Sequence, residues 1–278
     1  MAGPTFTLRS EKRAWSGRCY PALMPDGPAA ADAGQRGLEE HYAHYFGDLS
    51  RDFRAVSLSR LVASLTPPGR VLDVGCGSGA TSEVLWRRGH QVVSMDPSDA
   101  MVAMCREHLG RAGLSTQHVR LGGVESISEQ AAYDAVIALD VIEHIEDDLA
   151  ALRHLRRALV PSGRLILSVP ALSRLFGPKD VAVGHYRRYD RQPLCDLLAR
   201  AGFAVERRRF WNALGVLPVW ISVARGKRLS ERVRYAGRSR AARVLNDALR
   251  IWFLVVENHI PSPIGLTLVV VARPLDRL

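Results

Sequence analysis

The chain has 278 residues, 47% of them apolar and 24% charged, so it can bury a core and does not resemble a disordered or collagen-like protein. Thirty-eight Lys and Arg against 28 Asp and Glu give a formal net charge of +10, which makes nucleic acid, an anionic membrane or a phosphorylated substrate candidate partners. The four cysteines include no Cys-x-x-Cys pair, which disfavours a zinc site or a disulfide framework. No apolar run is long enough to cross a bilayer, so we expect a soluble, cytoplasmic protein.

The first part of the chain divides into two segments. Residues 1–34 are rich in Pro, Ala and Gly without a sustained period and predict a flexible leader. Residues 35–66 have apolar side chains three and four apart, which predicts an N-terminal helical lid. The aromatic side chains of this segment, Tyr42, Tyr45 and Phe53 among them, either form a core stripe or close over a ligand. In the second interpretation Tyr42 and Tyr45 bind the substrate.

Short apolar segments alternate with helical patterns from residue 67 onward. We expect residues 67–210 to form a core domain and residues 266–278 to return to it as a final strand. Strands that alternate with helices predict an α/β fold, with a mostly parallel sheet and helices on both faces. The predicted strands are Val71–Val74, Gln91–Met95, Val119–Leu121, Ala135–Leu139, Leu165–Val169, Phe203–Arg207 and Leu268–Ala272.

An insertion precedes the last strand. A plain alternating fold does not need residues 211–265, which we expect to form a helical cap over the substrate. Within residues 225–250 there are nine Lys and Arg and two acids, a balance of +7 out of the molecule's +10. The basic excess is therefore local. It fits a solvated helix face, a peripheral contact with a membrane, or an RNA contact, and scarce aromatic residues among the arginines make nucleic acid the less favoured partner.

A glycine-rich run follows the first predicted strand. Gly75, Gly77 and Gly79 occupy alternate positions, where glycine lets the backbone turn sharply against a ligand. The Gly-x-Gly-x-Gly spacing differs from the Gly-x-Gly-x-x-Gly of a dinucleotide site, and the carboxylate of Asp73 favours a cationic ligand over a pyrophosphate. Asp96 ends the second strand 21 positions after Gly75, where an acid can accept both hydroxyls of a ribose.

These motifs resemble those of the class I S-adenosylmethionine-dependent methyltransferases, in particular bacterial enzymes that act on small molecules. The resemblance rests on Asp73-Val74-Gly75-Cys76-Gly77-Ser78-Gly79, Asp96-Pro97-Ser98, Tyr133-Asp134 through Leu139-Asp140, and Glu143-His144. It implies a Rossmann-like seven-stranded sheet with an antiparallel last strand, and S-adenosylmethionine as cofactor. The cofactor-binding residues it implies are Asp73, Gly75, Cys76, Gly77, Gly79, Asp96, Pro97, Met101, Val124 and Leu139.

One position departs from the family pattern. Members often have an acid after the third strand for the adenine amino group, where this sequence has Gly122-Gly123-Val124-Glu125. Adenine recognition would then rest on the Val124 backbone or on Glu125.

Two segments supply candidates for the chemistry. Asp140, Glu143 and His144 follow the fourth strand, and three interpretations are open: a structural turn, a His144 base, or a divalent-metal trio like the Glu-x-x-Glu-His of some ubiquinone-pathway O-methyltransferases. We predict no metal. The loop 170–191 carries Asp180 and His185, which could form an oriented base, or could belong to an ion-paired loop. The candidate catalytic residues are thus Glu143, His144, Asp180 and His185, and further candidates for acceptor binding are Tyr186, Arg188, Trp211 and Asn212.

The sequence thus predicts methyl transfer to a small-molecule acceptor, and we expect that acceptor to be a specialised metabolite. Two alternatives keep the cofactor site. One is a cyclisation such as cyclopropane formation in natural-product biosynthesis. The other is methylation of a lipid-linked or RNA acceptor through the basic insertion.

Overall fold

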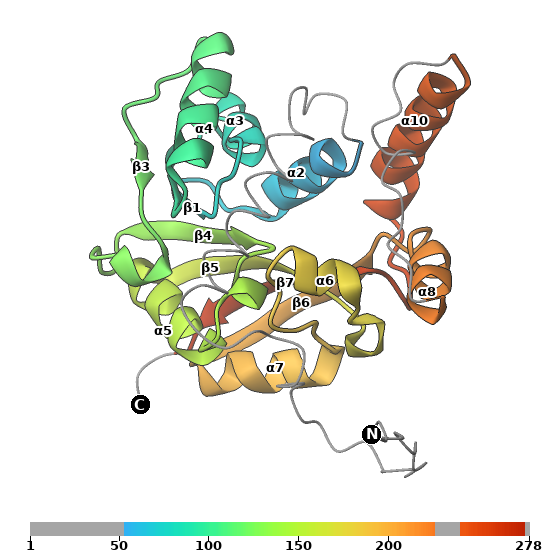
Figure 1. The fold of residues 1–278 in the computed structure, drawn as a ribbon. Helices are drawn as coiled ribbons and strands as arrows, with labels where there is room; N and C mark the ends of the chain where they lie inside the picture. The colour runs from blue at the N-terminus through green and yellow to red at the C-terminus, as the bar shows by residue number, and fades with distance from the viewer. Residues whose placement is uncertain (1–52, 226–239, 276–278) are drawn as a thin grey trace, which may run out of the picture.

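The computed structural model describes residues 53–225 and 240–275. In chain order its strands are β1 (Arg70–Val74), β2 (Gln91–Asp96), β3 (Val119–Leu121), β4 (Tyr133–Leu139), β5 (Leu159–Pro170), β6 (Phe203–Trp211) and β7 (Thr267–Pro274). They form one seven-stranded sheet in the order β3-β2-β1-β4-β5-β7-β6 (Figure 1). The first five strands run parallel, and β7 pairs antiparallel with both β5 and β6. The expected mostly parallel sheet with an antiparallel last strand is confirmed.

Helices cover both faces of this sheet, as expected. The helices are α2 (Phe53–Leu65), α3 (Ala80–Arg87), α4 (Asp99–Arg111), α5 (Asp148–Ala158), α6 (Pro178–Ala182), α7 (Arg191–Arg200), α8 (Val216–Ala224) and α10 (Arg240–Trp252). Short helical turns are η3 (Val124–Ser126), η4 (Ile142–His144), η5 (Ser173–Leu175) and the π-helical η6 (Phe253–Glu257). In Figure 1, α5 and α7 lie below the sheet and α2, α3 and α4 lie above it.

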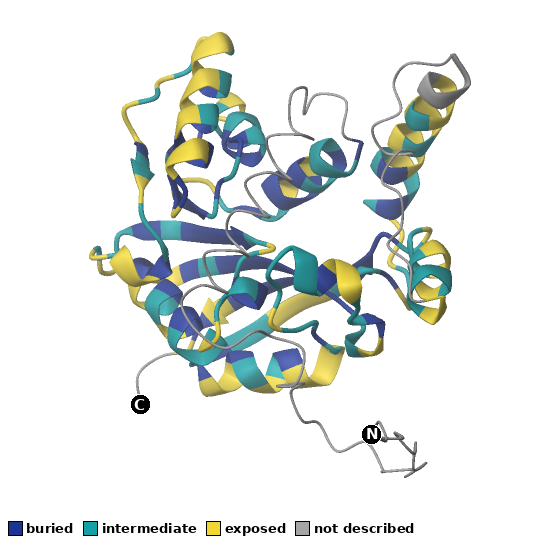
Figure 2. Ribbon diagram, viewed as in Figure 1, coloured by how far each residue is buried: buried dark blue, intermediate teal, exposed yellow. Residues whose placement is uncertain are grey.

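Successive strand residues serve opposite layers because side chains alternate across a strand. In β1, Leu72 packs in the cluster that includes Leu155 of α5, whereas its neighbour Val71 packs with Val62 of α2 and Leu85 of α3. Strands buried on both faces read as continuous apolar runs, which is why β1 and β4 are conspicuous in the sequence. Figure 2 shows the resulting band of buried residues along the central strands.

The N-terminal segment and the insertion meet at one end of the sheet. Phe53 of α2 packs with Trp211 at the end of β6 and with Phe253 of η6, at ring-centroid distances of 5.1 Å between the two phenylalanines and 4.8 Å between Trp211 and Phe253. Phe53 is therefore a core residue. None of the helices in the described part of the chain is long and apolar enough to cross a membrane.

Some element boundaries differ from the sequence-based expectation. The sixth strand continues to Trp211, four residues further than expected, because its pairing with β7 extends from Phe203 to Trp211. The loop 170–191 is not a plain connection, since it contains η5 and α6. The leader 1–34, Tyr42 and Tyr45 lie outside the described residues.

Candidate functional site

The candidate site lies where the order of the strands reverses. Strands β1 and β4 are adjacent and parallel, β2 and β3 extend to one side, and β5 extends to the other. In open α/β sheets ligands bind in the crevice at the carboxyl ends of the strands at such a point. A cavity of about 330 Å³ opens there. Both the glycine loop after β1 and the turn after β4 line it, so the topology joins two motifs that lie about 65 residues apart in sequence.

The glycine loop has a backbone that only glycine tolerates well. Gly75, Gly77 and Gly79 have φ values of 66°, 51° and 82°. A Cβ on Gly75 would lie 2.6 Å from Val141 Cγ2, and a Cβ on Gly79 would lie 2.7 Å from Cys105 Sγ. Gly75, Cys76 and Gly77 line the cavity, whereas Gly79 serves as the turn into α3. The loop is thus fixed in a conformation that presents its backbone to the cavity.

Asp73 is a buried acid at the floor of the cavity. Its side chain is 2% exposed, and Ser82 Oγ donates a hydrogen bond of 2.6 Å to its Oδ2. Burial raises the pKa of Asp73 to about 7, and nearby Asp96 adds to the rise while the Ser82 hydrogen bond opposes it. A cation that enters the cavity would stabilise the ionised form of this carboxyl group by forming an ion pair with it.

Asp96 holds the glycine loop in place. Gly77 N donates to Asp96 Oδ2 at 2.9 Å, and Ser98 N donates to Oδ1 at 3.0 Å. A carboxylate oxygen can accept more than one hydrogen bond. Asp96, Pro97, Met101 and Val124 do not line the cavity itself. Met101 and Val124 are buried beside the end of β2, so the adenosine side of the expected cofactor site lies beyond the cavity, whereas Asp73 and Leu139 lie within its lining.

Glu143 is the most unusual acid of the site. It is fully buried on η4, and both of its carboxylate oxygens lack a hydrogen-bond partner among the described residues. Burial, and then the charge of Asp140, raise the pKa of Glu143 well above its ordinary value. An orphaned buried carboxyl group on a cavity wall is costly, and a ligand that donates a hydrogen bond or a positive charge would relieve that cost.

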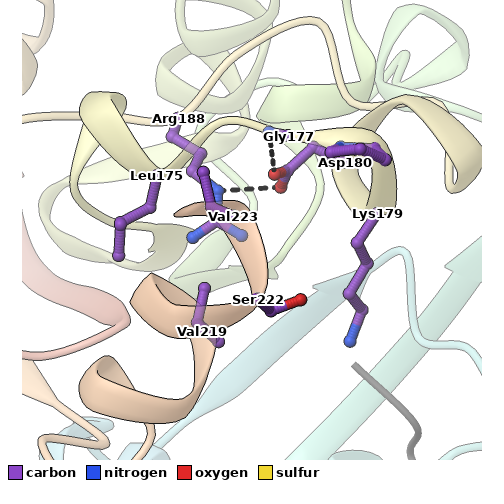
Figure 3. Close-up of a pocket in the computed structure, with 9 residues that line it drawn as sticks. Leu175, Gly177, Lys179, Asp180, Arg188, Val219, Ser222 and Val223 are labelled. Atoms are coloured by element: carbon purple, nitrogen blue, oxygen red, sulfur yellow. Dashed lines mark hydrogen bonds and ion pairs between the residues drawn. The ribbon is translucent and has the colours of Figure 1, made fainter. Parts of the chain in front are cut away.

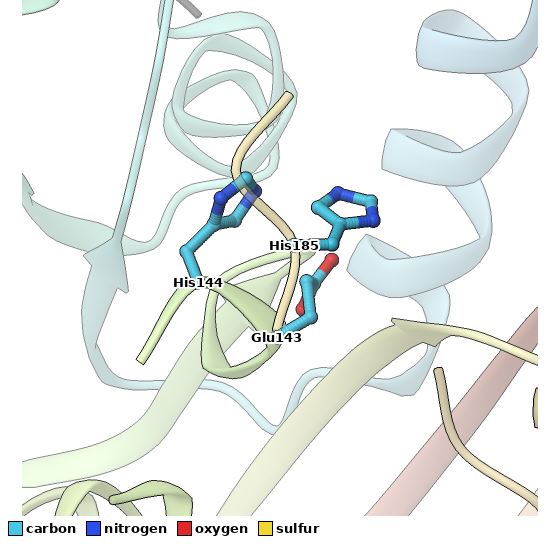
Figure 4. A group of neighbouring side chains, drawn as sticks. All are labelled: Glu143, His144 and His185. Atoms are coloured by element: carbon cyan, nitrogen blue, oxygen red, sulfur yellow. The ribbon is translucent and has the colours of Figure 1, made fainter. Parts of the chain in front are cut away.

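Two histidine rings stand beside Glu143 (Figure 4). His144 and His185 meet edge to face, with ring centroids 4.7 Å apart. Burial lowers the pKa of His144 to about 3, and the neighbouring His185 contributes to this shift. His144 is therefore a neutral ring at neutral pH, able to accept or donate a hydrogen bond but weak as a proton acceptor.

His185 is oriented by Asp180, as the sequence predicted. Its Nδ1 lies 3.0 Å from Asp180 Oδ1, which leaves Nε2 available to a ligand when the carboxylate is ionised. Burial raises the pKa of Asp180, but hydrogen bonds from His185 and Arg188 outweigh it and hold the pKa below its ordinary value. Figure 3 shows Asp180 joined to both Arg188 and Gly177, and the two distances are 2.8 Å from Arg188 Nε and 3.0 Å from Gly177 N.

The loop that carries His185 is docked onto the turn that carries His144. Tyr186 N donates to the carbonyl of Glu143 at 2.8 Å, and Arg187 binds Asp148 at 2.7 Å. These contacts bring the two predicted catalytic segments together. The ion-paired loop and the oriented base were alternatives at the level of sequence. The structure contains the Arg188–Asp180 ion pair and the His185–Asp180 contact together, and the role of His185 as a base stays a prediction.

Three side chains that could bind a metal ion lie together in the structure. They differ from the Asp140, Glu143 and His144 trio that the sequence suggested. Ligand atoms of Glu143, His144 and His185 lie within 4.8 Å of one another. Asp140 is not in this set, because it sits exposed at φ 54° after β4 and accepts a 3.0 Å hydrogen bond from Ser168 Oγ. Two imidazoles and a carboxylate suit a divalent transition metal, and they equally suit an acceptor hydroxyl.

The expected acceptor-binding residues divide into two groups. Trp211 and Arg188 line the cavity, although Trp211 is also a core residue whose Nε1 donates to Asn258 Oδ1 at 3.0 Å. Asn212 and Tyr186 do not line it, so their role in acceptor binding stays a prediction. Asn212 is buried at φ 66° behind the wall, and Tyr186 is 38% exposed, with the Arg187 guanidinium 5.8 Å from its ring.

Sequence reasoning missed several residues of the cavity wall. Arg54 and Ser59 reach it from α2, and Lys179 reaches it from α6. Glu257 supports the wall from behind, since its carboxylate accepts hydrogen bonds from Asn212 N at 3.0 Å and Ala213 N at 2.9 Å. The signal for Glu257 was available, because it is a lone acid within an apolar run. Arg54 and Ser59 carry no comparable local signal.

Comparisons with known proteins agree with this geometry. A family model described as a methyltransferase domain matches residues 45–207. A ubiquinone biosynthesis O-methyltransferase of Bradyrhizobium diazoefficiens is 36% identical over 120 residues, which cover 42% of this chain and 47% of that protein. A second one, from Xanthomonas axonopodis pv. citri, is 38% identical over 116 residues, covering 41% and 48%. The chain thus spans about half the length of the curated relatives it matches.

A solved structure shares the fold over most of its length. The Burkholderia thailandensis 1,6-didemethyltoxoflavin-N1-methyltransferase, with bound 1,6-didemethyltoxoflavin and S-adenosylhomocysteine, is 21% identical, with a TM-score of 0.55 over 91% of this chain and 94% of that one. At this identity the likeness is one of fold.

Proposed function

Because the chain belongs to the methyltransferase-domain family, we propose that it is an S-adenosylmethionine-dependent methyltransferase that acts on a small-molecule acceptor. The observation that carries this proposal is a single cavity that Asp73 and the glycine loop line on one side and the Asp180–His185 pair lines on the other. A site for a cationic cofactor and an oriented base therefore face the same space.

The residues present fit this cofactor. When bound, S-adenosylmethionine supplies an electrophilic methyl group on a positively charged sulfur. The raised pKa of Asp73 reports a carboxyl group that lacks a cationic partner, and the positive φ values of Gly75 and Gly77 turn the loop backbone along the cavity. Asp96 would hold the ribose. Because the methyl group arrives activated, positioning of the reactants can provide on the order of 7–11 kcal/mol of the rate enhancement.

The cavity suits an acceptor with an apolar body and a hydroxyl group. Leu58, Val183 and Val219 supply apolar wall, while His185 and Lys179 supply polar groups. Asp180 would accept a hydrogen bond from Nδ1–H of His185, so Nε2 would be placed to take the proton of an acceptor hydroxyl group. The names of the curated relatives, which are O-methyltransferases, also support an oxygen acceptor.

The class of acceptor is a finer step. We propose a hydroxylated compound with an apolar body, such as a specialised metabolite, because Leu58, Val183 and Val219 form apolar parts of a wall that also carries many polar and charged residues. Cyclisation with the same cofactor stays an alternative hypothesis, and no contact among the described residues favours it over methyl transfer.

Methyl-labelled S-adenosylmethionine and a panel of lipophilic phenols and alcohols test the proposal. We expect mass spectrometry to find labelled methyl on an acceptor oxygen. His185→Ala should retain cofactor affinity in calorimetry within about twofold and lower turnover by about 10²–10⁴-fold, the range of a lost general base. His144→Ala should also spare the cofactor and reduce turnover, since it removes the ring against which His185 packs.

His118→Ala is the matched control, because His118 is an exposed histidine stacked on Trp86 away from the cavity. Full turnover in His185→Ala would contradict the assigned base. Asp180→Asn acts through His185, so it should shift the pH–rate profile along the pH axis and not only reduce the maximal rate. Absence of cofactor binding to the wild-type protein would contradict the function itself.

Chelation separates the two uses of the Glu143, His144 and His185 set. We predict that the protein needs no metal, so activity after treatment with EDTA should equal that of the untreated protein. Loss of activity that added divalent cation restores would contradict this prediction. Such a result would indicate that Glu143, His144 and His185 bind a divalent cation.

A further inference from the structure

The outer face of α10 carries an exposed apolar stripe that no other described element covers. Val244, Ala248 and Ile251 recur at intervals of four and three residues, which places them on one side of α10, and Val255 follows in η6. Val244 is 69% exposed, and Ile251 and Val255 are each 62% exposed. The opposite side of the same helix and of η6 carries Phe253, which is buried in the core. The side chains of the stripe are therefore different from those that pack this segment against the core.

A second exposed apolar group lies on α8. Leu217 is 63% exposed and Trp220 is 57% exposed, whereas Val219 and Val223 of the same helix face Gly177 and the Asp180 loop (Figure 3). Figure 2 shows α8 and α10 at the same side of the molecule, both with large exposed areas. We call Leu217, Trp220, Val244, Ile251, Trp252 and Val255 the insertion face.

Positive charge accompanies these apolar side chains. Residues 225–250 carry nine Lys and Arg and two acids in the sequence. Among them Arg225, at the end of α8, and Arg250, beside the stripe, are exposed. Aliphatic and tryptophan side chains flanked by arginines are the composition of a segment that lies in the interface of an anionic bilayer.

We propose that the insertion face docks the protein onto an anionic lipid surface. A second copy of the chain is a poorer occupant, because it would bring the exposed Arg225 and Arg250 against an identical, positively charged face. Anionic headgroups neutralise that charge while Ile251, Val255 and Trp220 enter the boundary with the acyl chains. This attachment is peripheral, and it goes beyond methyl transfer because it needs neither cofactor nor acceptor.

The docking also has a consequence for the cavity. Val219 of α8 lines the cavity, while Leu217 and Trp220 of the same helix form part of the insertion face. A bilayer held against α8 would therefore lie one helix away from the acceptor. A lipophilic acceptor dissolved in the membrane could then reach His185 without crossing bulk water.

Sedimentation with vesicles tests the docking. The full-length protein would be mixed with vesicles of phosphatidylcholine alone or with phosphatidylglycerol, at low and at high salt. We expect binding to the vesicles with phosphatidylglycerol, weakened by salt, and much weaker binding to phosphatidylcholine alone. Arg225→Gln/Arg250→Gln should weaken partitioning at low salt about thirtyfold, on the basis of about fivefold for each arginine near the surface.

A second double variant tests the apolar side chains of the insertion face. Ile251→Ser/Val255→Ser should weaken partitioning by at least about tenfold at every salt concentration, because burial of an aliphatic side chain contributes that much or more. Circular dichroism checks that each variant folds. The matched controls are Leu275→Ser, which changes another exposed aliphatic residue, and Arg153→Gln/Arg157→Gln, which removes the same charge from α5; neither should alter binding.

Three results would overturn the proposal. The first is no sedimentation of the wild-type protein with phosphatidylglycerol vesicles at low salt. The second is binding that neither double variant weakens. The third is a dimer in light scattering that Ile251→Ser/Val255→Ser converts to a monomer, which would assign the insertion face to self-association. None of these results bears on turnover of a water-soluble acceptor, so the proposed function is tested separately.

Discussion

At the scale of single residues, Asp73 shows how a binding site is kept ready at the expense of stability. The carboxyl group is buried and accepts a hydrogen bond of 2.6 Å from Ser82 Oγ, and its pKa stands near 7 against an ordinary value of 3.8. Above pH 7 the folded protein therefore holds a buried negative charge that the unfolded chain would expose to water. A cationic ligand removes that penalty, and the affinity for the ligand gains accordingly.

Asp73→Asn should separate these two effects. In the absence of cofactor the variant should be more stable at pH 8, on the order of 2 kcal/mol, because the amide can still accept from Ser82 and carries no charge. Its affinity for S-adenosylmethionine should fall at least about tenfold. Urea unfolding and calorimetry measure the two quantities. A variant that is both less stable and unchanged in affinity would contradict the role of Asp73.

Residue-level prediction succeeded where the chemistry lies within one short run. The glycines, Asp73 and the Asp180–His185 pair are each recognisable from local spacing, and the structure confirms their conformation or contact. The approach of His185 to His144 was not predictable in this way. The two histidines lie 41 positions apart, and a backbone hydrogen bond from Tyr186 to Glu143 brings them together.

At the scale of elements, η6 is attached to the end of β6 through one carboxylate. Glu257 is 4% exposed and accepts from the backbone N–H groups of Asn212 and Ala213, just where β6 ends. Asn212 has φ 66°, a conformation that asparagine tolerates better than most residues. The carboxylate thus satisfies two buried donors and fixes the wall behind the cavity.

Glu257→Gln should lower the free energy of unfolding by about 1–3 kcal/mol, since the amide nitrogen cannot accept the second N–H and leaves it unsatisfied. Asp247→Asn is the matched control, because Asp247 is exposed on α10. Urea denaturation of both variants provides the measurement. Equal stability of Glu257→Gln and the wild-type protein would show that the attachment of η6 does not depend on these bonds.

Element prediction was strongest for the buried strands and weakest in the connections. The runs that became β1, β2 and β4 are apolar on both faces and short, as parallel strands are. The five residues of α6 carry no periodic pattern of their own, and Gly177 N bound to Asp180 Oδ2 at 3.0 Å starts this helix. Such a helix depends on its contacts with the rest of the fold, so its sequence reads as a loop.

At the scale of the whole molecule, two buried groups oppose each other in the dependence of stability on pH. Asp73 binds a proton in the folded state up to about pH 7 but only up to its ordinary pKa of 3.8 when unfolded, so its contribution falls as pH rises between these values. His144 has a pKa of about 3 when folded and an ordinary value of 6.5, so its contribution rises over nearly the same range. The two slopes largely cancel.

Single variants should expose the cancellation. Relative to the wild-type protein, Asp73→Asn should gain stability as pH rises from 4 to 7, and His144→Asn should lose it, each with a slope of about one proton. Urea unfolding at several pH values in the presence of EDTA measures both. Differences of the same sign would contradict the assigned pKa values.

The sequence by itself determined the parallel sheet, the order of its core elements and the cofactor loop, because these depend on periodicity and on backbone conformations that only glycine adopts readily. The tertiary structure alone decided which side chains share the cavity. It brought Arg54 and Ser59 into the wall, left Asn212 and Tyr186 outside the lining, and placed His185 with Glu143 and His144 in one set of possible metal ligands. Contacts between distant segments depend on how loops dock onto one another, and no local pattern encodes that docking.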